Sequence, residues 1–319
     1  MPQVDMPLSE LREYNGTNPR PDDFDRYWDE SIAQTEAQDP QVSLTLSDYQ
    51  VSFAECFDLY FSGIGGARVY AKYVRPKNIK GKVPAILVFH GYGGDSGEWS
   101  HLFGYIAAGY AVAAMDTRGQ GGKSEDVGGN TGSTVDGHII RGLNDDPKKL
   151  LYRSVFLDTA KLARIVSAFP EVDPTRVSAT GGSQGGALTL ACAALTPTLY
   201  KCAPAMPFLC DYKRVWEMDL CVDAYKELHT YFRHSDPRHL REDEIFTKLG
   251  YIDNQYLAPR IKSKTLMLTG LMDTICPPST QFAAYNKITA EKEMLVYPDF
   301  GHEDMTGSYD IVFKWLTEA

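Results

Sequence analysis

The sequence lacks the features that would point to a nucleic-acid-binding or membrane protein. Its 42 acidic residues outnumber the 32 basic ones, which gives a net charge of −10, and no run of Lys or Arg forms a basic face. No stretch of about eighteen apolar residues occurs, and Met1 to Leu11 do not combine a basic with an apolar segment. We therefore expect no nucleic-acid partner, no membrane span, no secretion signal and a cytoplasmic location.

Residue patterns typical of metal and redox sites are also missing. None of the six cysteines belongs to a Cys-x-x-Cys pair, so we expect reduced thiols in the core. His229, His234 and His239 recur at a spacing that spreads the rings around a helix, which indicates surface histidines and not zinc ligands. The sequence therefore indicates no zinc site.

What is present is the strand and helix pattern of an α/β protein. Four short, mostly apolar runs are typical of strands buried on both faces: residues 85–89, 111–114, 176–179 and 265–269. Helical segments separate them, near residues 99–108, 150–169, 184–195 and 280–288. This alternation predicts a doubly wound, mostly parallel sheet. Antiparallel edge strands are expected earlier, within residues 42–61 and 69–74, and a strand at 293–297 and a helix at 309–316 end the fold.

Length and pattern together predict one domain over residues 1–319. Residues 1–40 form a helical extension, whose helix around Trp28 is expected to lie over the core as a lid or clamp. Between residues 208 and 260 aromatic and charged residues mix at helical spacing, which predicts an inserted helical cap. The Gly-rich stretch 119–137 predicts a long functional loop.

A candidate nucleophile lies in the sequence Gly-Gly-Ser-Gln-Gly at residues 181–185. It matches the Gly-x-Ser-x-Gly nucleophile elbow, and a predicted strand precedes it and a predicted helix follows it. Gly181 and Gly185 allow a tight turn that holds Ser183 in a strained conformation with its hydroxyl exposed. The N–H of Gln184, at the start of the helix, is the first expected donor to an oxyanion.

A serine hydroxyl needs a base to become a nucleophile, and His302 is the candidate. It follows the last predicted strand, where a fold with this elbow has its histidine, and the alternative is an ordinary surface histidine. Asp273, after the strand that follows the cap, is the expected partner of the imidazole. Asp299, three residues before His302, is its rival. Activity should fall in acid, because a protonated His302 cannot accept the serine proton.

A second oxyanion donor is expected in residues 90–94, His-Gly-Tyr-Gly-Gly, which directly follow a predicted strand. We expect the N–H of Tyr92 to be this donor and Tyr92 to contact the substrate, and the alternative is an ordinary glycine turn. Residues 118–124 look like a phosphate-binding loop, but Thr117 stands where that motif needs glycine. Nucleotide binding is therefore not expected.

Three motifs occur in order along the chain: Arg118-Gly119-Gln120, the elbow at 181–185, and His302-Glu303. With them the chain resembles carbohydrate esterase family 7, the acetyl xylan esterases that also act as cephalosporin C deacetylases. The opening segment from Met6 to Trp28 is similar to the start of that family's sequences. The resemblance implies an α/β-hydrolase fold with antiparallel N-terminal strands and a helical insertion.

The resemblance also implies an activity that uses neither a metal nor an organic cofactor, and it implies an assembly. The substrates would be small acetylated sugars, such as acetylated xylo-oligosaccharides, and cephalosporin C, and the assembly would be a homo-hexamer with active sites facing an internal chamber. Arg118, Gly119, Gln120 and Glu303 would be structural, although a surface ion pair is the alternative for Arg118. Other functions on this fold are a peptidase or amidase, a general short-chain esterase and, more remotely, a non-catalytic binding protein.

Overall fold

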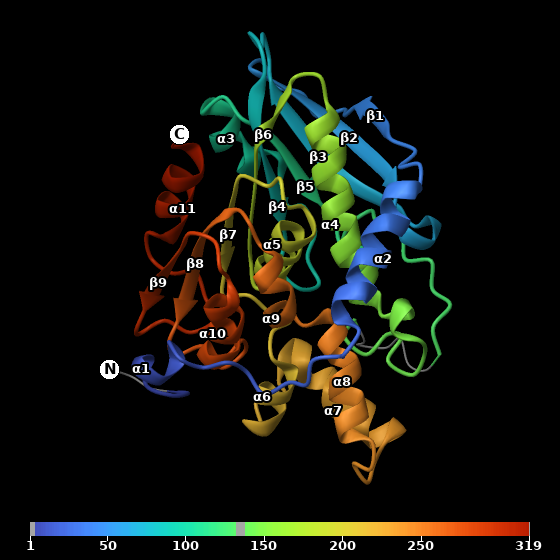
Figure 1. Ribbon diagram of the computed structural model, residues 1–319. Helices are drawn as coiled ribbons and strands as arrows, with labels where there is room; N and C mark the ends of the chain where they lie inside the picture. Colours follow the sequence, from blue (N-terminus) through green and yellow to red (C-terminus); the bar gives the residue numbers. More distant parts are fainter. Residues whose placement is uncertain (1–3, 132–137, 319) are drawn as a thin grey trace.

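The computed structural model describes residues 4–131 and 138–318, and within this part of the chain nine strands form one sheet (Figure 1). The sheet order is β1-β2-β3-β5-β4-β6-β7-β8-β9. The strands are β1 Ser43–Leu46, β2 Ala54–Ser62, β3 Arg68–Pro76, β4 Val83–Phe89, β5 Ala111–Met115, β6 Val172–Gly182, β7 Lys201–Ala205, β8 Lys264–Gly270 and β9 Lys292–Tyr297.

The helices account for most of the remaining regular structure. They are α1 Leu8–Leu11, α2 Phe24–Ala37, α3 Phe103–Ala107, α4 Leu151–Ala168, α5 Gln184–Leu195, α6 Tyr212–Glu217, α7 Lys226–Ser235, α8 Glu242–Leu249, α9 Asn254–Leu257, α10 Pro278–Lys287 and α11 Ser308–Thr317. Among the described residues, no helix combines the length and the apolar character needed to cross a membrane.

The sheet changes from antiparallel to parallel where the hydrophobic pattern changes. Taken in sheet order, neighbouring strands are antiparallel from β1 through β2 and β3 to β5, and they are parallel from β5 through β4, β6, β7 and β8 to β9. Every residue of β5 is buried, as expected for a strand covered on both faces. The sheet is therefore that of an α/β-hydrolase fold, which confirms the predicted fold class. All six cysteines are buried and unpaired, also as expected.

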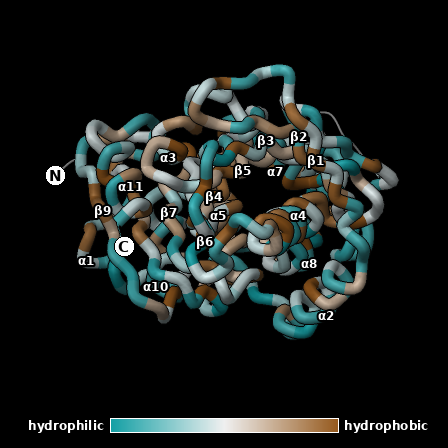
Figure 2. The backbone as a smooth tube through the Cα atoms, turned by 90° about the horizontal axis from the view of Figure 1, so that it is seen from above, coloured by the Kyte–Doolittle hydropathy of each residue, from teal (hydrophilic) through white to brown (hydrophobic). Residues whose placement is uncertain are grey.

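Helices cover both faces of the sheet. α4 and α5 belong to the main core on one face, whereas α3 and α11 pack against the other. Seen from above, the hydrophobic tracts gather on α4 and the neighbouring strands, while many outer loops are hydrophilic (Figure 2). α2 lies on the outer side of α4, where the Trp28 ring stacks on Phe156 and its indole N–H donates to the Tyr251 carbonyl. α2 thus joins α4 to the insertion.

Two details of the strand prediction were wrong. β7 was not predicted, because its five residues include Pro204, which has no N–H for the sheet ladder. The apolar alternation from Val51 to Phe53 does not form a strand, and the Phe53 side chain is exposed. Alternation alone could not separate this surface turn from the strand that follows it.

The segment between β7 and β8 contains α6 to α9, of which α6, α7 and α8 lie beyond the carboxyl ends of the strands, whereas α9 packs against α5 and α10 (Figure 1). A buried carboxylate, that of Asp211, connects this insertion to the N-terminal segment. It accepts hydrogen bonds from the Thr17 N–H at 3.0 Å, the Asn18 N–H at 2.8 Å and the Tyr14 hydroxyl at 2.8 Å. Residues 14–18 are therefore fixed by the insertion and by α10, whose Asn286 donates to the Tyr14 carbonyl at 2.8 Å.

Candidate active site

Ser183 lies at the turn between β6 and α5. Its φ of 57° and ψ of −120° are rare for a residue with a side chain. A Cβ atom on Gly181 would come within 2.4 Å of the Phe89 carbonyl oxygen, and one on Gly185 within 2.0 Å. Both positions therefore require glycine, as the sequence pattern predicts, whereas a Cβ on Gly182 would meet no atom within 4 Å.

The structure brings the predicted base and its partner to this serine. His302 Nε2 lies 2.9 Å from Ser183 Oγ, and His302 Nδ1 lies 2.8 Å from Asp273 Oδ2. Asp273 is fully buried, and its Oδ1 accepts the N–H groups of Ile275 and Cys276 at 2.9 and 2.8 Å. A carboxylate held in this way orients the ring so that Nε2 faces the serine hydroxyl and can accept its proton.

The sheet explains why residues so far apart in sequence meet. β6, β8 and β9 run parallel, so that their carboxyl ends lie on one edge of the sheet, and Ser183, Asp273 and His302 each follow one of these ends. The rival carboxylate, Asp299, is exposed on the loop before His302, and the imidazole is bonded to Asp273 instead.

The two expected oxyanion donors belong to segments that are tied together. Gln184 is the first residue of α5, where helix geometry leaves the backbone N–H without an intrahelical partner. The Gln120 and Gln184 side chains form a reciprocal amide pair, with N···O distances of 2.7 and 3.0 Å. Gln120 also accepts the Gly93 N–H at 2.9 Å. It therefore joins the loop that carries Tyr92 to the start of α5.

A family model described as acetyl xylan esterase (AXE1) matches residues 1–319. The chain belongs to the acetyl xylan esterase family. The structure of this chain is similar to the crystal structure of acetyl xylan esterase 1 from Thermoanaerobacterium sp. JW/SL YS485. The two share 57% identity with a TM-score of 0.97, and the match covers 98% of this chain and 99% of that one. The acetyl xylan esterase from Paenibacillus sp. R4 is 34% identical, with a TM-score of 0.93 and the same coverage.

A curated relative, the acetyl esterase Axe7A of Xylanibacter ruminicola, is 27% identical over 304 residues, which is 93% of this chain. The chain spans 66% of the length of that relative. Family membership, together with the two solved structures, makes this chain a serine hydrolase that acts as an esterase. The suggestion of a non-catalytic binding protein is therefore wrong.

Arg118 of this esterase is buried, so the alternative of a surface ion pair is wrong. Its guanidinium donates to both carboxylate oxygens of Asp158 at 2.7 Å, and the two side chains are only 2% and 1% exposed. A third bond reaches the Ile64 carbonyl at 3.0 Å. Burial raises the pKa of Asp158 above its ordinary value, even though Arg118 opposes that shift. Arg118 thus fixes the start of the Arg-Gly-Gln motif inside the core.

Gly119 and Glu303, the other two residues with a predicted structural role, contact nearby loops. Gly119 has a φ of +69°, a conformation that favours glycine, and its carbonyl lies 3.2 Å from His138 Nε2. Glu303 is exposed and accepts the Gly301 N–H at 3.0 Å, which closes the turn that presents His302. The predicted long loop continues from Gly119 into residues 132–137, which lie outside the described residues.

Two residues in contact with Tyr92 were missed by the sequence analysis. The Tyr92 hydroxyl donates to Glu227 Oε1 at 2.7 Å and lies 3.1 Å from His138 Nδ1. The contact between Tyr92 and a substrate stays a prediction. Glu227 is 2% exposed, and burial raises its pKa to about 7. One signal was available: its neighbours on α7, Leu228 and Tyr231, are apolar.

One group of potential metal ligands occurs among the described residues. Ligand atoms of Asp273, Cys276 and His302 lie within 4.8 Å of one another. The Asp273 carboxylate and His302 Nδ1 are bonded to each other, however, and a metal would have to break that bond. This group therefore fits proton transfer better than metal binding.

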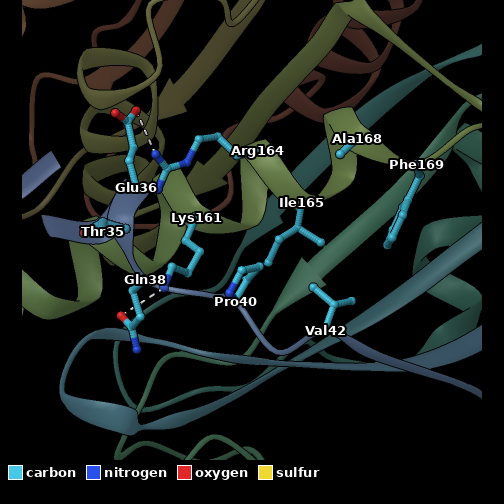
Figure 3. A pocket seen from close by; sticks show the side chains of 10 residues that line it. All are labelled: Thr35, Glu36, Gln38, Pro40, Val42, Lys161, Arg164, Ile165, Ala168 and Phe169. Atoms are coloured by element: carbon cyan, nitrogen blue, oxygen red, sulfur yellow. Dashed lines mark hydrogen bonds and ion pairs between the residues drawn. The ribbon is translucent and has the colours of Figure 1, made fainter. Parts of the chain in front are cut away.

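The protein has one hollow beside the nucleophile elbow and another that lies apart from the candidate site. A cavity of about 370 Å³ adjoins the elbow, and its lining includes His90, Gly181, Gly182 and Met305. A second hollow of about 510 Å³ lies between the end of α2 and α4 (Figure 3). There the Lys161 ammonium donates to Gln38 Oε1 at 3.1 Å, and Arg164 forms an ion pair with Glu36 at 2.8 Å. No residue of the candidate site lines this second hollow.

Proposed function

We propose that this esterase deacetylates small acetylated carbohydrates, in particular acetylated xylo-oligosaccharides, through an acyl-enzyme formed on Ser183. The observation that carries the proposal is the continuous contact from Ser183 Oγ through His302 to Asp273, with distances of 2.9 and 2.8 Å. The names of the solved relatives, both acetyl xylan esterases, support the acetyl group and the sugar.

The reaction follows from this geometry in two halves. Ser183 Oγ attacks the acetyl carbonyl while its proton passes to His302 Nε2, and the backbone N–H groups of Gln184 and Tyr92 bind the oxyanion. The imidazolium then gives the proton to the sugar oxygen, which leaves as an alcohol. Water repeats the attack on the acetyl-enzyme with His302 as the base, and acetate and free Ser183 result.

The proposal has three further parts, of which the cephalosporin C activity and the hexamer rest on the family resemblance. Cephalosporin C carries an acetyl ester on a small molecule, so that the same reacting group would be presented to Ser183. We also propose a homo-hexamer, whose internal chamber would admit only small substrates, and a cytoplasmic location. Light scattering on the purified protein tests the hexamer, and a monomer in solution would contradict it.

The deciding experiment replaces the serine. Ser183→Ala should lower kcat for p-nitrophenyl acetate by about 10⁴-fold or more without changing the circular dichroism spectrum. Ser167→Ala is the matched control, because that hydroxyl donates to the Ala163 carbonyl within α4. Retention of most activity in Ser183→Ala would exclude this nucleophile.

The substrate class needs a separate panel. Acetate release should be faster from acetylated xylobiose and cephalosporin C than release of longer acids from butyryl and octanoyl esters, and an acetanilide control should react slowly. Fast cleavage of the anilide would favour the amidase alternative. Equal rates on all chain lengths would favour a general short-chain esterase.

A further inference from the structure

Glu227 is a buried acid of the insertion that has no part in the proton transfers described above. Its carboxylate accepts four hydrogen bonds: from the Tyr92 hydroxyl at 2.7 Å and from the N–H groups of His138, Ile139 and Ile140 at 3.1, 2.7 and 3.0 Å. A buried carboxylate is costly unless its oxygens are satisfied in this way. The four donors around Glu227 therefore satisfy both oxygens of its carboxylate.

The four donors come from two separate segments, and Glu227 comes from a third. Tyr92 belongs to the loop after β4, residues 138–140 follow the long Gly-rich stretch, and Glu227 lies in the first turn of α7. Both oxygens are used: Oε1 binds Tyr92 and His138, and Oε2 binds Ile139 and Ile140. An amide could not serve all four donors, because its NH₂ group would face backbone N–H groups.

The Tyr92 loop needs such an anchor if its N–H is to bind an oxyanion. The loop is held after Tyr92 by the bond from the Gly93 N–H to Gln120 and by a bond from the Gly121 N–H to the Gly94 carbonyl at 3.0 Å. Neither bond fixes the Tyr92 side chain. An oxyanion donor stabilises charge only when it is already aimed at the position that the oxygen will take.

We propose that Glu227 is a positioning residue for ester hydrolysis, which anchors the Tyr92 hydroxyl and thereby aims the Tyr92 N–H at the developing oxyanion. The inference rests on the proposed function and deepens it, because it connects the insertion to the transition state. Removing one oxyanion donor outright costs about 10²–10³-fold in kcat, so that misaiming it should cost less, about 10–100-fold.

The test is a double-mutant cycle with Tyr92→Phe and Glu227→Ala. Tyr92→Phe should lower kcat for p-nitrophenyl acetate by about tenfold and Glu227→Ala by about 10–100-fold, with KM changed less than about threefold. The double variant should resemble Glu227→Ala alone, because both changes break the bond between the Tyr92 hydroxyl and Glu227, whereas an effect through the Tyr92 contact with His138 would add to that of Glu227→Ala. Inhibition by a boronic acid, which forms a tetrahedral adduct with the serine, should weaken in parallel with kcat.

The matched control is Asp253→Ala. Asp253 is another fully buried carboxylate of the insertion, and it accepts the N–H groups of Asp211 and Gln255 at 3.0 Å. Its loss should lower Tm as Glu227→Ala does, yet leave kcat per folded molecule and the boronate affinity unchanged. Glu227→Ala behaving like this control would overturn the proposal.

If Glu227→Ala does not fold, the Tyr92→Phe and Ser183→Ala variants still test the proposal and the proposed function. Tyr92→Phe removes only one oxygen atom and is then decisive, because a wild-type kcat in this variant would also overturn the proposal. Failure of the proposed function is distinguishable, since an active Ser183→Ala variant would show it whatever Glu227 does.

Discussion

Replacing Arg118 alone should destabilise this esterase more than replacing Arg118 and Asp158 together. In Arg118→Met the Asp158 carboxylate, which is 1% exposed, loses the guanidinium that donates two bonds of 2.7 Å to it. An unpaired carboxylate at such a depth costs about 3–5 kcal/mol in the free energy of unfolding.

The double variant Arg118→Met/Asp158→Leu removes both charges and fills a similar volume. Burial raises the pKa of Asp158 despite Arg118, which indicates that desolvation outweighs the attraction within the pair. The pair therefore contributes little net stability. The loss that remains is the bond to the Ile64 carbonyl, worth about 1 kcal/mol.

Thermal unfolding followed by circular dichroism measures the difference. For a chain of this size about 1 kcal/mol corresponds to about 2 °C in Tm, so that Arg118→Met should lose about 6–10 °C and the double variant about 2 °C. A double variant as unstable as the single one would contradict this prediction, because it would mean that the ion pair itself is a net source of stability.

Two smaller predictions concern the elbow and the strand end beside it. Gly185→Ala should abolish soluble expression, because its Cβ would lie 2.0 Å from the Phe89 carbonyl oxygen, whereas Gly182→Ala should express normally; equal yields would contradict this. His90 Nε2 accepts the Thr117 N–H at 2.9 Å, and burial lowers the pKa of His90 below 6.5. The unfolded chain therefore takes up this proton first as the pH falls, so that the stability contribution of neutral His90 is present above pH 6.5 and declines below it. Wild-type protein should lose more Tm than His90→Gln between about pH 7.5 and 5.5, and equal losses would count against it.

Local sequence was enough to predict the elements that place Ser183. The apolar run before it, the helical run after it and the two glycines around it are contiguous, and each has a direct physical reason. The chain order Ser183, Asp273, His302 then predicted which loops would meet, because parallel strands end on one edge of the sheet.

The partners of side chains could not be predicted in the same way. Arg118 binds Asp158 on α4, and Tyr92 binds Glu227 on α7, 135 residues away. Such pairs depend on how helices pack. The apolar neighbours of Glu227 on α7 indicate burial, but no local pattern names Tyr92 as its partner or Asp158 as the partner of Arg118. β7 was missed for a different reason: β5 has the same length and was predicted from an unbroken apolar run, whereas Pro204 interrupts the run of β7 and argues against a strand.

The bonds from residues 14–18 to Asp211 restrict how this enzyme can be redesigned. An insertion grafted from another esterase would alter substrate choice only if it kept an acceptor for the Thr17 and Asn18 N–H groups. Conversely, a shortened chain that lacks those residues would bury the Asp211 carboxylate, now 0% exposed, without the donors that neutralise its cost. A chimeric enzyme should therefore exchange residues 14–18 and the insertion together, because these two distant parts of the polypeptide form one structural unit.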